Sequence, residues 1–306
     1  MKIINFGSLN LDHVYRVERF VSPGETVPCL EYTRFCGGKG LNQSIALARA
    51  GATVFHYGKI GRDGAVLVRA LREATVDTRH ISEVDGPTGH AVIQVTDDGE
   101  NSIIIEGGAN QKMDSGDTAT VFGLLSDGDW LLVQNEINGV ADIFDAAHQS
   151  RCRLAFNPAP MTAAIAELPL ARVDLLIVNE TEGQILTGET QTETILARLR
   201  SHCPRGCIVI TLGGDGAVCL DGDEIVRQPP FVVEAVDTTG AGDTFVGYFL
   251  AAFSGGTSVR EALKLGCRAA SLCVTRPGAA DSIPMLSEVE AAPHHPRHQA
   301  PVGPGP

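Results

Sequence analysis

One stretch of the chain combines glycines with a carboxylate in a way that could transfer a phosphoryl group. Residues 236–245 read Val-Asp-Thr-Thr-Gly-Ala-Gly-Asp-Thr-Phe, and an apolar run follows. Glycines let successive backbone N–H groups point into one concavity, and a helix beginning at about Ala241 adds unpaired amides and a positive dipole end. Such a turn binds anions, most often phosphate. Asp243 would repel that anion, which indicates a different role, that of accepting the proton of an attacking hydroxyl.

Taken alone, this stretch is better explained as a capped helix start with Asp243 in its first turn. A second glycine cluster lies roughly 200 residues earlier and reads Cys-Gly-Gly-Lys-Gly-Leu-Asn-Gln over residues 36–43. It is not a Walker loop, because no Ser or Thr follows Lys39 and the glycine spacing differs. Its glycines would let a ligand approach the backbone, with Lys39 and Asn42 as hydrogen-bonding groups. A plain glycine-rich helix entry is an equal alternative.

The elements that must position these residues have the pattern of a parallel sheet. Four nearly continuous apolar runs, separated by helix-length segments, cover residues 130–134, 153–156, 174–178 and 207–210. Such runs are typical of strands that are buried on both faces. Each ends in polar or glycine residues, as does a first short strand at residues 3–7. Ligands bind at the carboxyl ends of parallel strands, so these ends predict one ligand-binding edge.

A hairpin is predicted apart from this sheet. Two β-branched runs at residues 91–95 and 102–105 flank Asp-Asp-Gly-Glu, and an Asp-Gly turn in this setting is a strong hairpin signal. With candidate strands near residues 14–18 and 28–35, it could form a small separate sheet. A lid or a dimer interface would use such a sheet.

Composition limits the classes of function. The 306 residues are 43% hydrophobic and 20% charged, as in a soluble globular protein. A net charge of −13 argues against a general nucleic-acid or anionic-membrane binder. No apolar run is long enough to span a bilayer, and no basic leader precedes the first strand, which predicts a cytoplasmic protein. The eight cysteines lack zinc-site spacing and read as small buried residues. The Pro-, His- and Ala-rich segment 291–306 is predicted to be disordered.

Together with Asn-Glu-Thr-Glu at residues 179–182, the two glycine clusters resemble the ribokinase family of sugar and nucleoside kinases, the phosphofructokinase-B type. Either cluster alone would be weak, whereas both in this order are specific. The resemblance covers roughly residues 1–290. It implies an α/β three-layer sandwich, with a mostly parallel central sheet, helices on both faces, and a small β-sheet lid from about residues 10–35 and 88–107. A homodimer through the lid is a further expectation.

The resemblance also implies a sugar site and a transfer site. The residues that match the sugar-binding positions are Asn10, Asp12, Gly38, Lys39, Asn42, Glu136 and Asp243. Asp243 would be the base, and the turn that stabilises the transferred phosphoryl group would be Gly240, Ala241, Gly242 and Asp243. A sugar with several hydroxyls needs carboxylate acceptors and amide or ammonium donors, so these residue types suit it.

Nucleotide and metal positions follow from the same resemblance. Those expected to bind ATP are Asn179, Thr211, Leu212, Gly213, Gly214, Asp215, Gly216, Gly242 and Cys267. Family members usually place His or Asn where Cys267 stands, which leaves the nucleotide preference open. Glu182 would organise Mg²⁺ through water. A monovalent cation, K⁺, would be held by Asp237, Thr239, Cys273, Arg276, Gly278 and Ser282, several through backbone carbonyls.

The expected activity is ATP-dependent phosphorylation of the primary hydroxyl of a small sugar, with D-ribose first among the candidates. A kinase for fructose, a deoxy sugar or a nucleoside is the related alternative, although no apolar slot for a nucleoside base is evident. A sugar-binding regulator without chemistry belongs to a different class. The intact Asp243 and the glycine turn argue against it.

Overall fold

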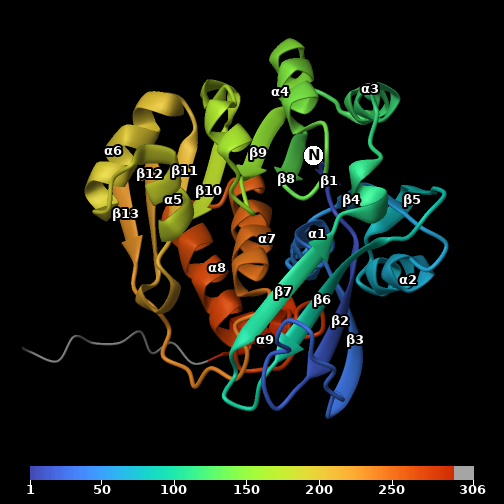
Figure 1. The fold of residues 1–306 in the computed structure, drawn as a ribbon. Coiled ribbons are helices and arrows are strands. Elements are labelled where there is room, and N and C mark those ends of the chain that lie inside the picture. The colour runs from blue at the N-terminus through green and yellow to red at the C-terminus, as the bar shows by residue number, and fades with distance from the viewer. Residues whose placement is uncertain (293–306) are drawn as a thin grey trace, which may run out of the picture.

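The computed structural model describes residues 1–292 (Figure 1). Nine strands of this described part form the main sheet, in the order β13-β12-β11-β10-β9-β8-β1-β4-β5. Neighbours from β5 to β11 are parallel, and β12 and β13 add to the edge antiparallel. The strands are β1 (Ile3–Phe6), β4 (Val54–Ile60), β5 (Asp77–Glu83), β8 (Trp130–Gln134), β9 (Arg153–Asn157), β10 (Leu175–Asn179), β11 (Cys207–Thr211), β12 (Ala217–Asp221) and β13 (Glu224–Gln228).

Helices cover both faces of the sheet and make three layers. One face carries α1 (Lys39–Arg49), α2 (Ala65–Glu73), α7 (Ala241–Ser254), α8 (Val259–Cys273) and α9 (Leu286–Ala291). The other carries α3 (Ser115–Leu124), α4 (Val140–Gln149), α5 (Glu180–Thr187) and α6 (Thr192–His202). Short 3-10 turns occupy Gly108–Gln111, Ala163–Glu167, Leu170–Arg172 and Gly213–Asp215. Successive residues of one strand enter different cores: Leu131 faces the second set of helices, and Leu132 the first. The continuous apolar runs follow from this double burial.

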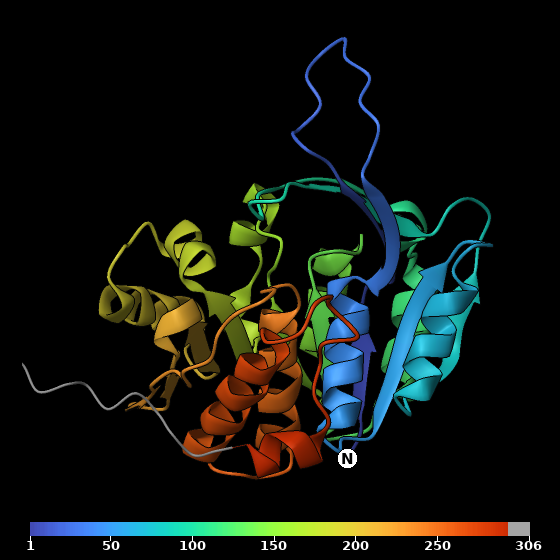
Figure 2. The same cartoon turned by 90° about the horizontal axis from the view of Figure 1, so that it is seen from below.

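A separate four-stranded sheet forms the lid, in the order β3-β2-β6-β7. Its strands are β2 (Asn10–Arg16), β3 (Glu31–Gly37), β6 (Gly89–Val95) and β7 (Asn101–Glu106). The predicted hairpin is β6 paired antiparallel with β7, and β6 continues the sheet beside β2. Figure 2 shows this sheet at one end of the main body, with the loop between β2 and β3 projecting farthest. The three layers and the lid confirm the expected architecture.

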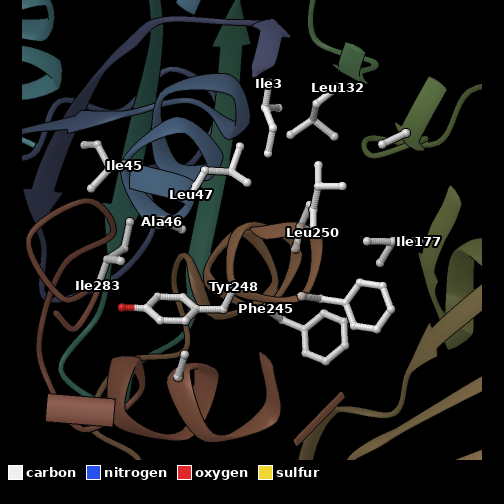
Figure 3. Close-up of a cluster of buried hydrophobic side chains, with 14 of the residues drawn as sticks. Ile3, Ile45, Ala46, Leu47, Leu132, Ile177, Phe245, Tyr248, Leu250 and Ile283 are labelled. Atoms are coloured by element: carbon white, nitrogen blue, oxygen red, sulfur yellow. The ribbon is translucent and has the colours of Figure 1, made fainter. Parts of the chain in front are cut away.

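A close crossing of α1 and α7 fixes the geometry of the site. Both helices contribute to one buried cluster with the central strands, as Figure 3 shows. A Cβ at Gly247 would lie 2.3 Å from the Cβ of Ala46, so only glycine permits this approach. One helical turn before the crossing, α7 carries Asp243 and α1 carries Asn42 and Gln43. The crossing therefore brings these three side chains together.

The C-terminal prediction is only partly described. Ala291 is the last residue of α9, so the folded part extends past residue 290. The rest of the predicted disordered segment, from residue 293, lies outside the described residues. In residues 1–292 no helix combines the length and the hydrophobicity that a membrane crossing requires.

Candidate active site

Helix α7 begins at the glycine turn, as predicted. Its N-cap is Gly240, in the left-handed region with φ 77°, and no side chain caps the helix. Because a helix leaves its first N–H groups without intrahelical partners, the turn offers amides to a ligand. The positive end of the helix dipole adds to their attraction for an anion.

Two amides hold the Asp243 carboxylate. Asn42 Nδ2 donates to Oδ2 and Gln43 Nε2 donates to Oδ1, each at 2.9 Å. Gln43 Nε2 also donates to Asn157 Oδ1 at 3.0 Å. Asp243 is 8% exposed, so both of its oxygens are directed by protein donors. Gln43 and Asn157 were not among the predicted site residues, although both lie in stretches that the sequence analysis examined.

The predicted sugar-binding residues converge at the base of the lid. Glu136 Oε2 accepts from the backbone N–H of Lys39 at 2.9 Å and from Ser8 Oγ at 2.5 Å. Asn10 Oδ1 accepts from Asn110 Nδ2 at 2.7 Å. A further residue, Gly38, is the N-cap of α1 and lies against the backbone of Asn10. Ser8 and Asn110 escaped prediction, because neither belongs to a motif.

Asn10 and Asp12 lie on a lid strand, within the expected lid range of about 10–35, but that strand begins earlier than expected. The sequence suggested a polar loop after the first strand, with the lid strand beginning near residue 14. Strand β2 instead begins at Asn10, directly after the turn that follows β1. Alternation along β2 places Asn10 and Asp12 on the same face of the lid. One lid strand therefore carries both of these predicted sugar-binding residues.

Burial and like charge perturb the carboxylates of the sugar side. Burial raises the pKa of Asp12 to about 7, assisted by the negative charges of Glu136 and Asp243. Burial also raises the pKa of Glu136. For Lys39, burial alone would lower the pKa, but the carboxylates of Asp243, Glu136 and Glu182 raise it. The Lys39 ammonium is thus the cation that balances this group of carboxylates.

A cavity of about 230 Å³ adjoins Asp243. Lys39, Asn157, Asn179, Glu182 and Gly242 line it together with Asp243. Asn179 and Glu182 cap α5 reciprocally: Glu182 N–H donates to Asn179 Oδ1 at 2.8 Å, and Asn179 N–H donates to Glu182 Oε2 at 2.9 Å. Burial raises the pKa of Glu182. The sequence-predicted phosphate and Mg²⁺ residues are therefore brought to one side of the base.

A larger cavity of about 610 Å³ continues from the smaller one, and Thr211, Thr238 and Gly242 line both. Its walls are mostly apolar. The predicted nucleotide residues that line it are Thr211, Gly213, Gly214, Gly216, Gly242 and Cys267. Residues that the sequence analysis missed are Pro230, Phe231, Val232, Val233, Ala235, Ala270, Ser271 and Val274. The apolar run at residues 231–233, in the loop after β13, was the available signal in the sequence. The structure leaves Val232 of this run 55% exposed.

Asn179 lines only the smaller cavity, and two further predicted nucleotide residues line neither cavity. Leu212 packs instead against the core beneath α3 to α6, and Asp215 is exposed on the 3-10 turn. Their side chains therefore cannot make the expected lining contacts in this conformation. Gly213, Gly214 and Gly216 of the same loop do line the larger cavity, so the loop itself lies at this cavity.

The predicted cation residues form a compact group beside the α7 turn, with one exception. Asp237 accepts from the N–H of Thr239 at 2.9 Å and from the N–H of Gly278 at 2.8 Å. Cys273 Sγ and Ser282 Oγ are 3.0 Å apart. The guanidinium of Arg276 points to Glu288 instead, at 2.6 Å, so only its backbone remains for the site. Among the described residues, no cluster of three or more His, Cys, Asp or Glu side chains is placed to hold a metal.

Comparison with known proteins decides the family. Residues 1–286 match the model of the pfkB family carbohydrate kinase. The chain belongs to the pfkB family of carbohydrate kinases. It is therefore a sugar kinase, which confirms the family that the two glycine clusters indicated.

Curated and solved relatives of this pfkB kinase cover nearly all of the chain. It is 37% identical to the ribokinase of Haemophilus influenzae over 92% of this chain and 95% of that protein. It is 34% identical to the ribokinase of Staphylococcus aureus, over 94% and 98%. The structure of Arabidopsis thaliana ribokinase complexed with ribose and ATP matches with a TM-score of 0.84 and 32% identity, over 94% and 97%. A ribokinase from Cryptococcus neoformans in complex with ADP gives 0.82 and 35%, over 94% and 98%.

Proposed function

We propose that this pfkB kinase transfers the γ-phosphoryl group of ATP to the primary hydroxyl of D-ribose, giving D-ribose 5-phosphate and ADP. The observation that carries the proposal is the position of Asp243. It lies at the uncapped start of α7, lines the smaller cavity, and adjoins the carboxylates of the sugar side. The relatives named ribokinase support it, as does the neighbour solved with ribose and ATP.

The sugar side suits a small polyhydroxylated ring. Asp12 and Glu136 supply acceptors, while Asn10, Lys39 and Asn42 supply donors. Asn10 and Asn42 are each 5% exposed, and the other three are half-buried. A site of buried polar groups rejects a ligand that lacks a matching hydroxyl, because it leaves those groups unpaired. The lid would exclude water by closing over the bound sugar.

The mechanism gives each part of the site its own role. Asp243 accepts the hydroxyl proton as the oxygen attacks the γ-phosphorus, and the bond from phosphorus to the bridging oxygen of ADP breaks in line. The amides of Gly240, Ala241, Gly242 and Asp243 stabilise the charge on the transferred group. The Lys39 ammonium, in the cavity beside Asp243, adds positive charge.

The chain also offers sites that suit the expected ions. Glu182 brings a buried carboxylate to the cavity that Asp243 and Asn179 share, and carboxylate with water is the setting in which proteins hold Mg²⁺. When bound, Mg²⁺ would neutralise phosphate charge there. Asp237, Thr239, Cys273, Gly278, Ser282 and the backbone of Arg276 would hold K⁺. Activity that survives both a chelator and replacement of K⁺ by Li⁺ would contradict these two assignments.

We also propose a homodimer through the lid. Ile103, Ile104 and Ile105 of β7 are 51%, 66% and 56% exposed, on a strand at the edge of the lid sheet. An exposed apolar edge strand invites pairing with another chain. Sedimentation at micromolar concentration tests this, and a monomer there would contradict it.

Replacing Asp243 by Asn tests the central assignment. Asp243→Asn should lower kcat by about two orders of magnitude or more, the scale of a lost general base. Ribose binding, measured by calorimetry, should remain. Asp145→Asn, on the exposed face of α4, is the matched control. Near-normal turnover in Asp243→Asn would contradict the role.

A coupled assay for ADP with pentoses, hexoses and nucleosides tests the substrate. Ribose should give the highest kcat/KM. Turnover highest with another sugar would replace ribose by that sugar and keep the kinase assignment. Ribose binding with no turnover of any sugar would favour the regulator instead.

A further inference from the structure

A chain of fully buried polar side chains leads from Asp243 into the interior. It runs through Gln43, Gln134, Asn5, Ser44 and His56, and each is 0% exposed. These residues come from α1 and from three strands of the main sheet, β8, β1 and β4. Burying so many polar groups is costly unless their hydrogen bonds are made, so the directions of those bonds carry information.

A backbone carbonyl fixes the donor-to-acceptor direction along this series of hydrogen-bonded side chains. Asn5 Nδ2 donates to the carbonyl oxygen of Gly40 at 2.8 Å, and a carbonyl can only accept. The amide of Asn5 therefore cannot be reversed. Its Oδ1 must face Gln134, whose Nε2 donates to it at 3.0 Å.

The orientation of Asn5 fixes that of Gln134, and Gln134 in turn fixes that of Gln43. Gln134 Nε2 donates at 2.7 Å to Gln43 Oε1, so the oxygen of Gln43 faces away from the base. The Nε2 of Gln43 is then left to donate to Asp243 Oδ1 and Asn157 Oδ1. Reversing Gln43 would set its oxygen against the carboxylate and its NH₂ group against that of Gln134. Both contacts would be repulsive.

The far end of the chain is neutral. Ser44 Oγ accepts from Asn5 Nδ2 at 2.8 Å and shares a hydrogen bond with His56 Nδ1, also at 2.8 Å. Burial lowers the pKa of His56 to about 4, so its imidazole is neutral at neutral pH. No member of the chain between Asp243 and His56 gains or loses a proton at that pH. The chain orients groups and does not carry protons.

We propose that Gln43 is a positioning residue for Asp243, and that Gln134 and Asn5 specify which end of Gln43 faces the base. The inference rests on the proposed role of Asp243. An N–H donor stabilises a carboxylate over the carboxylic acid and restricts its orientation. Gln43 thus holds the Asp243 carboxylate in one orientation, while ribose and ATP would contact other side chains.

The test replaces Gln43 by Met, which has similar length and no amide. Gln43→Met should lower kcat about 10- to 100-fold, the scale of one hydrogen bond to a charged group. The KM values for ribose and ATP should change less than about threefold. The acid limb of the kcat profile should move to higher pH, because the carboxylate loses a donor that favours its ionised form. Gln149→Met, exposed at the end of α4, is the control.

A second variant distinguishes a positioning effect from a loss of folded protein. Gln134→Met leaves Gln43 in place but removes the donor that sets its direction. The acid limb of its kcat profile should also move to higher pH, with a smaller loss of kcat. This effect would have to act through Gln43, because Gln134 lines neither cavity. Circular dichroism and the stoichiometry of ribose binding report the folded fraction for both variants.

Two outcomes would overturn the proposal. One is a wild-type pH profile and kcat in the folded variants. The other is a loss of kcat that matches a loss of ribose-binding stoichiometry, which is what a purely structural role gives. An active Asp243→Asn enzyme would instead overturn the base assignment, so the two failures are distinguishable.

Discussion

The two sides of the Asp243 turn differ in the polarity of the residues that line them. On the acceptor side, half-buried carboxylates, buried amides and one half-buried ammonium surround the place proposed for the sugar. On the donor side, the larger cavity is walled by glycines and by apolar side chains such as Phe231, Val233 and Val274. Polar walls recognise each hydroxyl of a ligand, whereas apolar walls recognise size and flatness. We therefore expect strict selection of the sugar and weak selection among the nucleoside bases of the triphosphate.

The few hydroxyls of the donor cavity strengthen this contrast. Ser271 Oγ donates to the carbonyl of Arg268 at 2.7 Å, and Thr211 Oγ1 donates to the carbonyl of Val178 at 3.5 Å. These two hydroxyls are engaged with backbone carbonyls, and Thr238 at the α7 turn is the third hydroxyl residue of the lining. The described lining contains no Asn, Gln, Asp, Glu or Arg side chain. Such side chains could distinguish an amino group from an oxo group on the nucleoside base.

The largest expected effect lies on the acceptor side. Asp12→Ala should lower kcat/KM for ribose about 100-fold, because a hydrogen bond to a charged group contributes about 1.5–3 kcal/mol. The KM for ATP should stay within about threefold, since Asp12 does not line the larger cavity. Steady-state kinetics with each substrate varied in turn measures both. An equal loss for both substrates would break the contrast between the two sides.

A smaller effect concerns stability without ligand. The folded protein raises the pKa of Asp12 from 3.8 to about 7, mainly through burial. Its contribution to the free energy of unfolding is therefore complete below pH 4 and is lost as pH rises through 7. Asp12→Asn should stabilise the free protein by about 1–3 kcal/mol at pH 8 and by nothing at pH 4. Urea denaturation at both pH values measures this, with Asp145→Asn as control. Destabilisation at pH 8 would contradict it.

The smallest effect is expected on the donor side. Values of kcat/KM for ATP, GTP, CTP and UTP should agree within about tenfold, because an apolar pocket discriminates weakly between ligands of similar shape. The coupled assay at saturating ribose measures this. A preference for ATP above about 100-fold would mean that backbone groups of the loop after β13 form hydrogen bonds with the edge of the adenine ring.

Most strands of the main sheet that are buried on both faces could be predicted from sequence, while its two edge strands could not. The strand Trp130–Gln134 matches its prediction residue for residue, because both of its faces are covered and its run is wholly apolar. The edge strand β5 carries Asp77, Arg79 and Glu83, and such polar content hides a strand. The hairpin of β12 and β13 was missed for a related reason, since β13 has mostly exposed residues.

The site was predictable only where a motif marks it. The glycine clusters identified Asp243, Lys39 and Asn42, because turns and close approaches constrain residue type. Asn110 and Asn157 lie outside both clusters and meet the site only through tertiary contacts. Gln43 was visible beside Asn42, but nothing local shows that its amide reaches Asp243. That contact depends on how two helices cross.

The crossing at Gly247 has a consequence for the order of assembly. The base and the amides that hold it are about 200 residues apart in sequence, and their meeting requires α7 to dock on α1. A chain that has folded its sheet and lid but not yet docked α7 has polar residues for a sugar and no base beside them. The proposed catalysis therefore requires the docking of α7 on α1, in addition to a folded sheet and lid.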